Sequence, residues 1–295
     1  MIANSTNRTE EYTRLFHGRG NHYGAWNFLT VDSIGAVLYA AFYAASEEEK
    51  TLVAMLSELA AGGSWQAFVL QRRYLQGAPS ELLFGELPQE QIGVEDGLKY
   101  RLNFLANQNI GLFPDMKNGR RFVRENARGK KVLNLFSYTC AFSVAAVAGG
   151  AESVVNVDMS KSALTTGREN HRINEFDGKR SQYLPYNILK SWSRIRKAGP
   201  YEMIIIDPPS FQKGSFAATK DYEKIIRRLG ELAAEKCTVL SALNSPELGT
   251  AFIKTLFKEN APEFAFVKRL DNMESFPSDD DERSLKNLIF QKGEV

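Results

Sequence analysis

Short apolar runs alternate with longer amphipathic segments over the last two thirds of the chain. The apolar runs cover residues 130–136, 153–158, 200–207 and 238–244. The segments between them, whose apolar residues recur at helical spacing, cover 142–150, 161–174, 220–235 and 247–260. This alternation of strands and helices predicts an α/β fold with a mostly parallel sheet that helices cover on both faces.

The pattern changes near the C-terminal end. Two apolar runs, 264–270 and 285–291, have only a largely polar stretch between them, DNMES followed by FPSDDDERS. Because no helix fits into this connection, the two runs are expected to end the sheet as an antiparallel pair. A further helix is expected over 114–128, ahead of the first strand of the sheet.

The first third of the chain has shorter elements. Two strands are expected within 27–44 and a helix over 46–63, with Ser46 as N-cap and two glycines at its end. Four more strand-like runs follow between residues 65 and 105. We therefore predict a small α+β domain over residues 1–97, followed by the α/β domain over residues 98–295.

Charge separates the same two parts. Residues 1–96 carry 6 of the 37 Lys and Arg residues but 12 of the 35 Asp and Glu residues. The other 31 basic and 23 acidic residues lie in residues 97–295, so the first part is acidic and the second is basic. A polyanionic partner is thus expected to bind the second part. There is no apolar run of membrane-spanning length and no signal-peptide pattern, so a cytoplasmic protein without membrane contact is predicted. The spacing of Cys140, Cys237 and the three histidines predicts neither a metal site nor a disulfide.

Polar residues follow three of the expected parallel strands, at the sheet edge where ligands bind in such folds. The stretch VLNLFSYTC ends at Cys140, and Asp158 lies 24 residues beyond Asn134, a spacing typical of an acid that accepts ribose hydroxyls. The alternative is a solvated acid that caps the next helix. In DPPSF, two prolines hold Asp207 extended beyond the sheet, where it can bind a planar amine. The alternative there is a simple strand-ending turn.

These stretches resemble a known family. VLNLFSYTC is similar to the class I S-adenosylmethionine-dependent methyltransferase motif V-L-D-L-G-C-G-T-G, and IIIDPPSF to that superfamily's (N/D)PP(Y/F) motif. More narrowly, NIGLFPDMKNGRRFV, VDMSKSALTTGREN and SLKNLIF resemble the bacterial large-subunit ribosomal RNA methyltransferases, and RLFHGRG extends the likeness to the first domain. The resemblance implies a Rossmann-like class I methyltransferase sheet, S-adenosylmethionine as cofactor, and RNA, in particular ribosomal RNA, as partner.

The resemblance also implies roles for single residues. Those expected to bind the cofactor are Phe113, Asp115, Asn134, Phe136, Ser137, Tyr138, Thr139, Cys140, Asp158, Met159, Asn187 and Ile188. Asn187 stands where relatives usually have Asp, and its amide oxygen can still bind an adenine amine. Asp207 and the Pro208 carbonyl are expected to orient the acceptor, with Phe211 stacked on its ring. Relatives that methylate cytosine C5 use a cysteine at DPP or on the following strand, and neither place has one here. Transfer to a base nitrogen is therefore expected.

The cofactor loop departs from its relatives in one place. They usually read S-Y-T-G-G-F, whereas this chain reads S-Y-T-C-A-F, with Cys140 and Ala141 in place of glycines. Both residues carry a Cβ atom, so we expect their backbone to avoid positive φ. A loop for S-adenosylmethionine, which has no phosphate, needs close backbone approach less than a dinucleotide loop does.

Basic residues gather beside the expected cofactor site. Those expected to contact RNA are Lys117, Arg120, Arg121, Arg124 and Arg128. Arg120, Arg124 and Arg128 share one helix face by their spacing, and the alternative is an ordinary solvated face. Two further functions stay open: a methyltransferase for a protein side-chain amide, and a non-catalytic S-adenosylmethionine- or RNA-binding protein. A homodimer is also left open.

Overall fold

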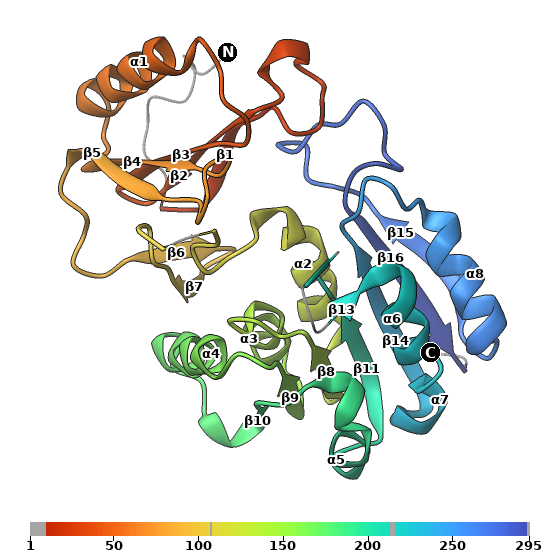
Figure 1. Cartoon of the computed structure of the whole chain (residues 1–295). Helices are drawn as coiled ribbons and strands as arrows, with labels where there is room; N and C mark the ends of the chain where they lie inside the picture. Colours follow the sequence, from red (N-terminus) through yellow and green to blue (C-terminus); the bar gives the residue numbers. More distant parts are fainter. Residues whose placement is uncertain (1–9, 107, 210, 213–215, 294–295) are drawn as a thin grey trace. The chain divides into compact units, whose positions relative to one another are not determined.

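The chain forms two compact units in a computed structural model that describes residues 10–106, 108–209, 211–212 and 216–293 (Figure 1). The first unit is Met1–Asp115 with Met273–Asp279, and the second is Met116–Asn272 with Asp280–Val295. The connection between the last two strands of the second unit therefore contributes a segment to the first.

The first unit is built on a five-stranded sheet whose order follows the sequence. Its elements are β1 (Thr13–His17), η2 (Gly24–Trp26), β2 (Leu29–Ile34), β3 (Val37–Phe42), α1 (Glu49–Gly62), β4 (Ala67–Arg72) and β5 (Ser80–Gly85), followed by the hairpin β6 (Ile92–Glu95) and β7 (Leu98–Arg101). Neighbouring strands are antiparallel except β3 and β4, which α1 connects and which are parallel. Leu56 and Ala60 of α1 are buried in a core with residues of β2, β3 and β4.

The first unit continues past the boundary that we expected at residues 97 and 98. Phe104 is 1% exposed, and its ring centre lies 6.3 Å from that of Tyr39. The amide of Asn103 donates to the Ile110 carbonyl, and the Gln71 side chain donates to the Ala106 carbonyl. These contacts hold the segment after β7 against the first sheet, which is why the two units divide after Asp115.

The second unit has a seven-stranded sheet of order β10-β9-β8-β11-β14-β16-β15. Its strands are β8 (Lys131–Leu135), β9 (Ser153–Val157), β10 (Ser181–Leu184), β11 (Tyr201–Ile206), β14 (Ala233–Leu243), β15 (Ala265–Leu270) and β16 (Lys286–Lys292). The pairs from β10 to β14 are parallel, whereas β16 is antiparallel to β14 and to β15. The predicted Rossmann-like sheet with an antiparallel C-terminal pair is confirmed.

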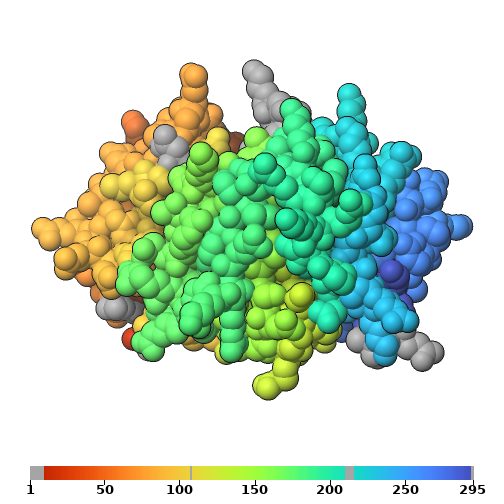
Figure 2. Space-filling model, turned by 90° about the horizontal axis from the view of Figure 1, so that it is seen from below, coloured from red at the N-terminus to blue at the C-terminus, as the bar shows by residue number. Residues whose placement is uncertain are grey.

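Helices cover both faces of this sheet (Figure 1). They are η3 (Pro114–Met116), α2 (Lys117–Asn126), α3 (Ala141–Ala148), α4 (Lys161–Ile173), η4 (Gly178–Arg180), η5 (Ile188–Lys190), α5 (Trp192–Lys197), α6 (Ala218–Ile226), α7 (Leu229–Leu232) and α8 (Thr250–Asn260). Alternate strand residues point to opposite faces, so Leu133 packs with α5 to α8 while Val132 packs with α2 and α3. Figure 2 shows the side that carries α5, where the green and teal segments pack closely.

Two parts of the second unit differ from the expected elements. β10 and α5 were not expected, because SQYL is short and only half apolar and a proline follows it. The helix expected over 220–235 is α6 and the short α7, and β14 begins at Ala233, whose partner is Tyr201 of β11. The strand pairing thus overrides the helical tendency of ELAAE.

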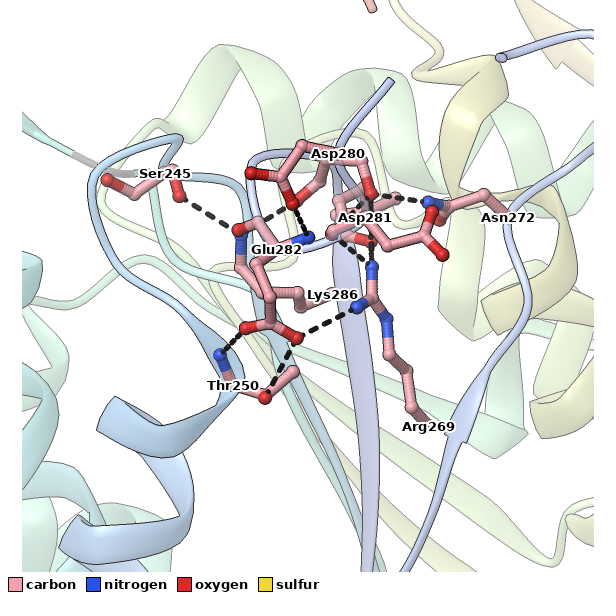
Figure 3. A network of polar contacts seen from close by, with 10 residues as sticks. Ser245, Thr250, Arg269, Asn272, Asp280, Asp281, Glu282 and Lys286 are labelled. Atoms are coloured by element: carbon pink, nitrogen blue, oxygen red, sulfur yellow. Dashed lines mark hydrogen bonds and ion pairs between the residues drawn. The ribbon is translucent and has the colours of Figure 1, made fainter. Parts of the chain in front are cut away.

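A network of hydrogen bonds and ion pairs stabilises the connection between β15 and β16 (Figure 3). The Lys286 ammonium is fully buried and donates to the carbonyls of Ser245, Glu282 and Ser284. The Glu282 carboxylate accepts from the backbone amide of Thr250 at the start of α8 and pairs with Arg269. Burial lowers the pKa of Lys286 to about 8, and its three carbonyl partners match its three donors. Both ends of the connection are thereby attached to the sheet.

Candidate functional site

The polar residues singled out in the sequence lie at one edge of the second sheet. Leu135, the last residue of β8, pairs with Val157 of β9 and with Ile206 of β11. Since these strands are parallel, the residues that follow them emerge at the same carboxyl edge. The sheet thus brings together the loop after Leu135, Asp158 and Asp207, as the sequence predicted.

The loop after β8 has an unusual backbone. Phe136, Tyr138 and Cys140 have φ angles of 58°, 46° and 62°, in the left-handed region that favours glycine. The motif V-L-D-L-G-C-G-T-G has glycine at these three positions. The expectation that Cys140 avoids positive φ is therefore wrong, because this chain keeps the backbone of the glycine-rich loop with larger side chains. Each such residue costs roughly 1–3 kcal/mol.

Cys140 is accommodated by a glycine elsewhere. Its side chain is fully buried at the start of α3 and lies against Gly167 in α4. A Cβ atom at Gly167 would come within 2.4 Å of the Cys140 sulfur and 2.9 Å of its Cβ. Because Gly167 has no Cβ atom, α4 leaves the space that the Cys140 side chain occupies. Ala141 begins α3 and is not among the residues with positive φ.

Asp158 links the two loops at the edge. Its carboxylate accepts hydrogen bonds from the backbone amides of Tyr138, at 2.9 Å, and Ser160, at 2.8 Å. The N-cap of α4 is Ser160, which accepts from the Ala163 amide, so helix capping does not account for Asp158. A carboxylate accepts about four hydrogen bonds, so two amide donors leave it capacity for hydroxyl groups of a ligand.

Three predicted cofactor residues carry buried polar atoms that have no hydrogen-bond partner within the described residues. These atoms are the side-chain oxygens of Asn134, Ser137 and Asn187. A buried polar atom without a partner costs about 1–3 kcal/mol. A ligand with amine and hydroxyl donors would satisfy these oxygens, and S-adenosylmethionine has both. Ile188, after Asn187, is 4% exposed and supplies apolar surface next to them.

A buried polar chain behind the loop was not foreseen. The Asn134 amide donates to the side-chain oxygen of Asn156, whose amide donates to the Ser143 hydroxyl. That hydroxyl contacts Nε2 of His171 at 3.0 Å. The first of these bonds directs the Asn134 oxygen away from Asn156, and burial lowers the pKa of His171. No single motif marks these residues, because they are far apart in the sequence.

Asp207 and Pro208 follow β11 directly; Asp207 is half-buried and Pro208 is buried. Tyr222 of α6 contacts the same region, and no role was predicted for it from the sequence. Its buried hydroxyl contacts the Ser241 hydroxyl at 2.7 Å and the Ala242 carbonyl at 2.8 Å, both in β14, while the Ile206 carbonyl lies farther away at 3.4 Å. Tyr222 is therefore bonded to β14 and reaches the end of β11, immediately before Asp207, only through the longer contact.

The remaining predicted site residues are less defined by the structure. Phe211 belongs to a two-residue strand, β12 (Phe211–Gln212), that pairs with β13 (Phe216–Ala217), and its side chain lies outside the described residues. Phe113 and Asp115 belong to the first unit, and Phe113 and Met159 have exposed side chains. Thr139 is buried, and its carbonyl accepts from the Asn170 side chain. The ligand contacts of these residues stay predictions.

The basic segment does not form one exposed arginine face. Arg120 is 3% exposed, and its guanidinium lies 6.0 Å from the centre of the Phe142 ring. Arg124 is half-buried, Arg121 is exposed, and Arg128 follows α2 and is exposed. Arg120 is thus buried beside Phe142 of α3, so contact between Arg120 and RNA at the surface is not supported. The RNA contacts of Lys117, Arg121, Arg124 and Arg128 stay predictions.

Two other searches covered the described residues. None of the described helices is both long and apolar enough to cross a membrane. Within the same part of the chain, His, Cys, Asp and Glu side chains do not gather into a group that could hold a metal ion.

Comparisons with known proteins agree with this arrangement. A family model described as "S-adenosylmethionine-dependent methyltransferase" matches residues 13–291. "Putative ribosomal RNA large subunit methyltransferase YwbD" of Bacillus subtilis is 32% identical over 62% of this chain and 48% of its own length. "Ribosomal RNA large subunit methyltransferase K/L" of Shewanella sp. MR-4 is 36% identical over 52% of this chain and 23% of its own length. The chain thus spans about half or less of the length of these relatives.

Among solved structures, "SMU.776, a putative methyltransferase complexed with SAH" is similar over nearly the whole chain. It has a TM-score of 0.84 and 27% sequence identity, and the match covers 98% of this chain and 77% of that one. Both units are therefore included in the similarity.

Proposed function

The chain belongs to the S-adenosylmethionine-dependent methyltransferase family, and on this premise we propose that it methylates a base nitrogen of RNA, specifically ribosomal RNA. The family membership confirms the resemblance and the cofactor expected from the sequence. RNA is proposed as acceptor because the curated relatives are named as ribosomal RNA large subunit methyltransferases. These names favour RNA over a protein amide or a non-catalytic role.

The observation that carries the proposal is the set of unpaired oxygens at the carboxyl edge. Asn134, Ser137 and Asn187 would hold the cofactor through these oxygens, with the Asp158 carboxylate accepting its ribose hydroxyls. When bound, S-adenosylmethionine supplies an activated methyl group on a positively charged sulfur. The amide groups of the loop are already bonded within the protein, as Tyr138 is to Asp158, which suits a ligand without phosphate groups.

Asp207 is proposed to hold the acceptor base. Its carboxylate is an acceptor for an amine hydrogen, and the Pro208 carbonyl offers a second acceptor beside it. Two such contacts fix the orientation of a planar amine, and positioning of this kind can supply about 7–11 kcal/mol of a reaction barrier. The Tyr222 hydroxyl lies 3.4 Å from the Ile206 carbonyl, next to this strand end.

The cysteines support transfer to nitrogen. Cys140 is fully buried, and burial raises its pKa, so it stays a neutral thiol. Cys237 is buried in the middle of β14 (Ala233–Leu243), where it pairs with Lys292, and burial raises its pKa to about 12. A covalent route through a cysteine needs a thiolate near the acceptor, and neither of the chain's two cysteines offers one.

The test is transfer of labelled methyl groups from S-adenosylmethionine to ribosomal RNA from cells that lack the protein. Asp207→Ala removes the acceptor oxygens of the side chain, and we expect the rate to fall about 100-fold or more because acceptor orientation is lost. Cofactor affinity, measured by calorimetry, should change less than about threefold. The matched control is Glu152→Ala, at an exposed acid at the amino end of β9.

Two results would count against the proposal. Full transfer by Asp207→Ala would remove Asp207 from the acceptor site. Tight cofactor binding by the wild-type chain, without transfer to any RNA from such cells, would overturn RNA as acceptor. Nucleoside analysis of the labelled RNA then tests the nitrogen assignment, which a label on carbon or on ribose would contradict.

A further inference from the structure

The first unit has its own carboxyl edge with a different chemistry. β3 and β4 are parallel, and β1 runs in the same direction because β1 and β3 are both antiparallel to β2. The residues that follow these three strands therefore emerge at one edge of the sheet. They include Arg19 after β1, Tyr43 after β3 and Arg73 after β4.

The two arginines converge on the tyrosine. The Arg19 guanidinium carbon lies 4.2 Å from the centre of the Tyr43 ring, and that of Arg73 lies 5.2 Å from it. Both distances are within the range of a cation–π contact. Arg19 is exposed, and Arg73 and Tyr43 are half-buried, so the group is open to a partner from outside. We call Arg19, Tyr43 and Arg73 the edge cluster.

The charge of the edge cluster is not neutralised by carboxylates. Within the described part of the chain, no carboxylate lies within ion-pair distance of Arg19 or Arg73. Arg73 donates instead to neutral oxygens: the Gln71 side chain at 3.1 Å, the Asn109 side chain at 3.5 Å and the Gln108 carbonyl. The neutral acceptors hold its guanidinium in place without cancelling the charge.

Neighbouring arginines show the opposite arrangement. Arg72 pairs with Glu49 at 2.6 Å and with Glu81 at 2.8 Å, and Arg14 pairs with the buried Asp32 at 2.5 Å. In a segment with 12 acids and 6 bases, carboxylates are abundant, and yet the edge cluster lacks them. The contrast marks the edge cluster as a place where positive charge is kept available.

We propose that the edge cluster binds the phosphate backbone of the RNA substrate. This inference rests on the proposed function for the identity of the RNA, but it assigns a contact to the first unit that neither family membership nor charge counting indicates. Tyr43 holds the two guanidiniums, so their N–H groups are oriented before binding and less entropy is lost when phosphates bind. Two phosphates of one single strand suit two such donors.

RNA fits the edge cluster better than an acidic protein segment does. An arginine stacked on an aromatic ring offers N–H donors at its edge and a flat face on which an unpaired base can stack. A carboxylate peptide would use only the donors. The acidic surroundings also oppose an acidic protein over a large contact area, whereas a flexible single strand can approach the cluster alone.

The test is binding of a fluorescently labelled single-stranded ribosomal RNA fragment to the full chain, followed by anisotropy over a range of salt concentrations. Arg19→Gln with Arg73→Gln should weaken binding about tenfold and reduce the slope of log affinity against log salt by about 1.4, since each lost phosphate contact contributes about 0.7. Lys50→Gln, which removes one positive charge from exposed α1 of the same unit, is the control for each single arginine change and should alter affinity less than about twofold.

Tyr43 separates pre-organisation from charge alone. Tyr43→Leu removes the ring that orders the guanidiniums and should weaken binding about threefold with little change in salt slope. Tyr43→Phe keeps the ring and should bind as the wild type does. Circular dichroism and urea unfolding of each variant show whether the first unit, which carries the substitutions, is still folded.

Several outcomes would overturn the inference. One is unchanged RNA affinity in the double arginine variant, and another is an equal loss in Lys50→Gln. A third is binding of polyglutamate, but not RNA, in a manner that depends on Arg19 and Arg73, which would make the partner an acidic protein. Failure of the proposed function looks different: RNA binding would depend on the edge cluster, but no methyl group would be transferred.

Discussion

Both units gather a cluster of residues at one edge of a sheet, but the two clusters suit different chemistry. In each, several parallel strands end at one edge, and the residues after them form a cluster. In the second unit that cluster has amides, hydroxyls and carboxylates, such as Asn134 and Asp158, whereas in the first it has Arg19 and Arg73 around Tyr43. The strand topology brings these residues together at one edge of the sheet. Their types then determine whether a cationic cofactor or a polyanion can bind there.

The two edges also differ in how their backbone is stabilised. The cofactor loop holds Phe136, Tyr138 and Cys140 at positive φ, and neighbouring elements must offset that strain. The edge cluster needs no such strain, since its three residues are held by ring contacts and by neutral hydrogen bonds. Substitutions close to the cofactor loop should therefore have larger effects on stability than substitutions at the first edge.

The largest effect is expected at the contact between Cys140 and Gly167. Gly167→Ala places a Cβ within 2.4 Å of the Cys140 sulfur and should lower the free energy of unfolding by about 3 kcal/mol, as expected for overpacking in a core. Cys140→Gly relieves the positive φ but leaves a small void, so the net change should be within about 1 kcal/mol. Urea unfolding of the variants measures both values.

The double variant sharpens this prediction. Cys140→Gly with Gly167→Ala moves the glycine back into the loop, removes the clash and adds a better helix former to α4. Its stability should be within about 1 kcal/mol of the wild type, which corresponds to a coupling energy of about 2–3 kcal/mol. If the changes in unfolding free energy of the two single variants simply add in the double variant, the side chains at positions 140 and 167 do not compete for the same space.

A smaller effect is expected at Tyr222. Tyr222→Phe leaves the Ser241 hydroxyl without this buried partner and should lower the free energy of unfolding by about 1–2 kcal/mol. Because it also loosens the strand end before Asp207, kcat should fall while the affinity for S-adenosylmethionine stays the same. Tyr74→Phe, which loses a hydrogen bond to Glu49 in the first unit, is the matched control and should leave kcat unchanged. An equal fall of kcat in both variants would contradict the positioning role.

The smallest effect concerns pH and again compares the units. Burial lowers the pKa of His171 in the second unit, and burial together with Arg14 and Arg19 lowers that of His17 in the first to about 3. The unfolded chain binds a proton near pH 6.5 while the folded chain does not, so stability is full above that pH and falls below it. Each histidine should cost at most about 1.4 kcal/mol on going from pH 6.5 to 5.5.

The measurement is urea unfolding at pH 7.5 and pH 5.5. His17→Gln and His171→Gln should each reduce the loss of stability between these values, whatever their effect at pH 7.5. Exposed His22→Gln provides the control. An unchanged loss in His171→Gln would indicate that His171 takes up a proton in the folded state.

Much of the second unit could be predicted from periodicity alone. Strand and helix alternation gave the parallel sheet, and the missing helix between residues 270 and 285 gave the antiparallel pair. The position of Asp158 and Asp207 after strands placed both at one edge. β10 was not predicted because a short, half-polar strand at the border of a sheet lacks the apolar run that marks a central strand.

The wrong or missing predictions share one physical cause. The type of a side chain does not reveal which residues that side chain will contact in the fold. Cysteine at position 140 predicted an ordinary backbone, but its φ is positive, and the sequence could not show that Gly167 leaves room for its side chain. The spacing of Arg120 and Arg124 placed them on one helix face but could not show that Arg120 itself is buried beside Phe142 of α3. Tyr222 resembled an ordinary core residue, and its role follows only from the strand ends that its hydroxyl joins.

The most direct test of the central comparison is the kinetics of methyl transfer to ribosomal RNA at varied RNA concentration. Asp207→Ala, at the edge of the second unit, is expected to lower kcat about 100-fold or more with RNA affinity retained. Arg19→Gln with Arg73→Gln, at the edge of the first, is expected to raise KM for RNA about tenfold with kcat nearly retained. If both variants lowered kcat alone, or if the arginine variant left KM unchanged, the division of cofactor chemistry and RNA contact between the two edges would be contradicted.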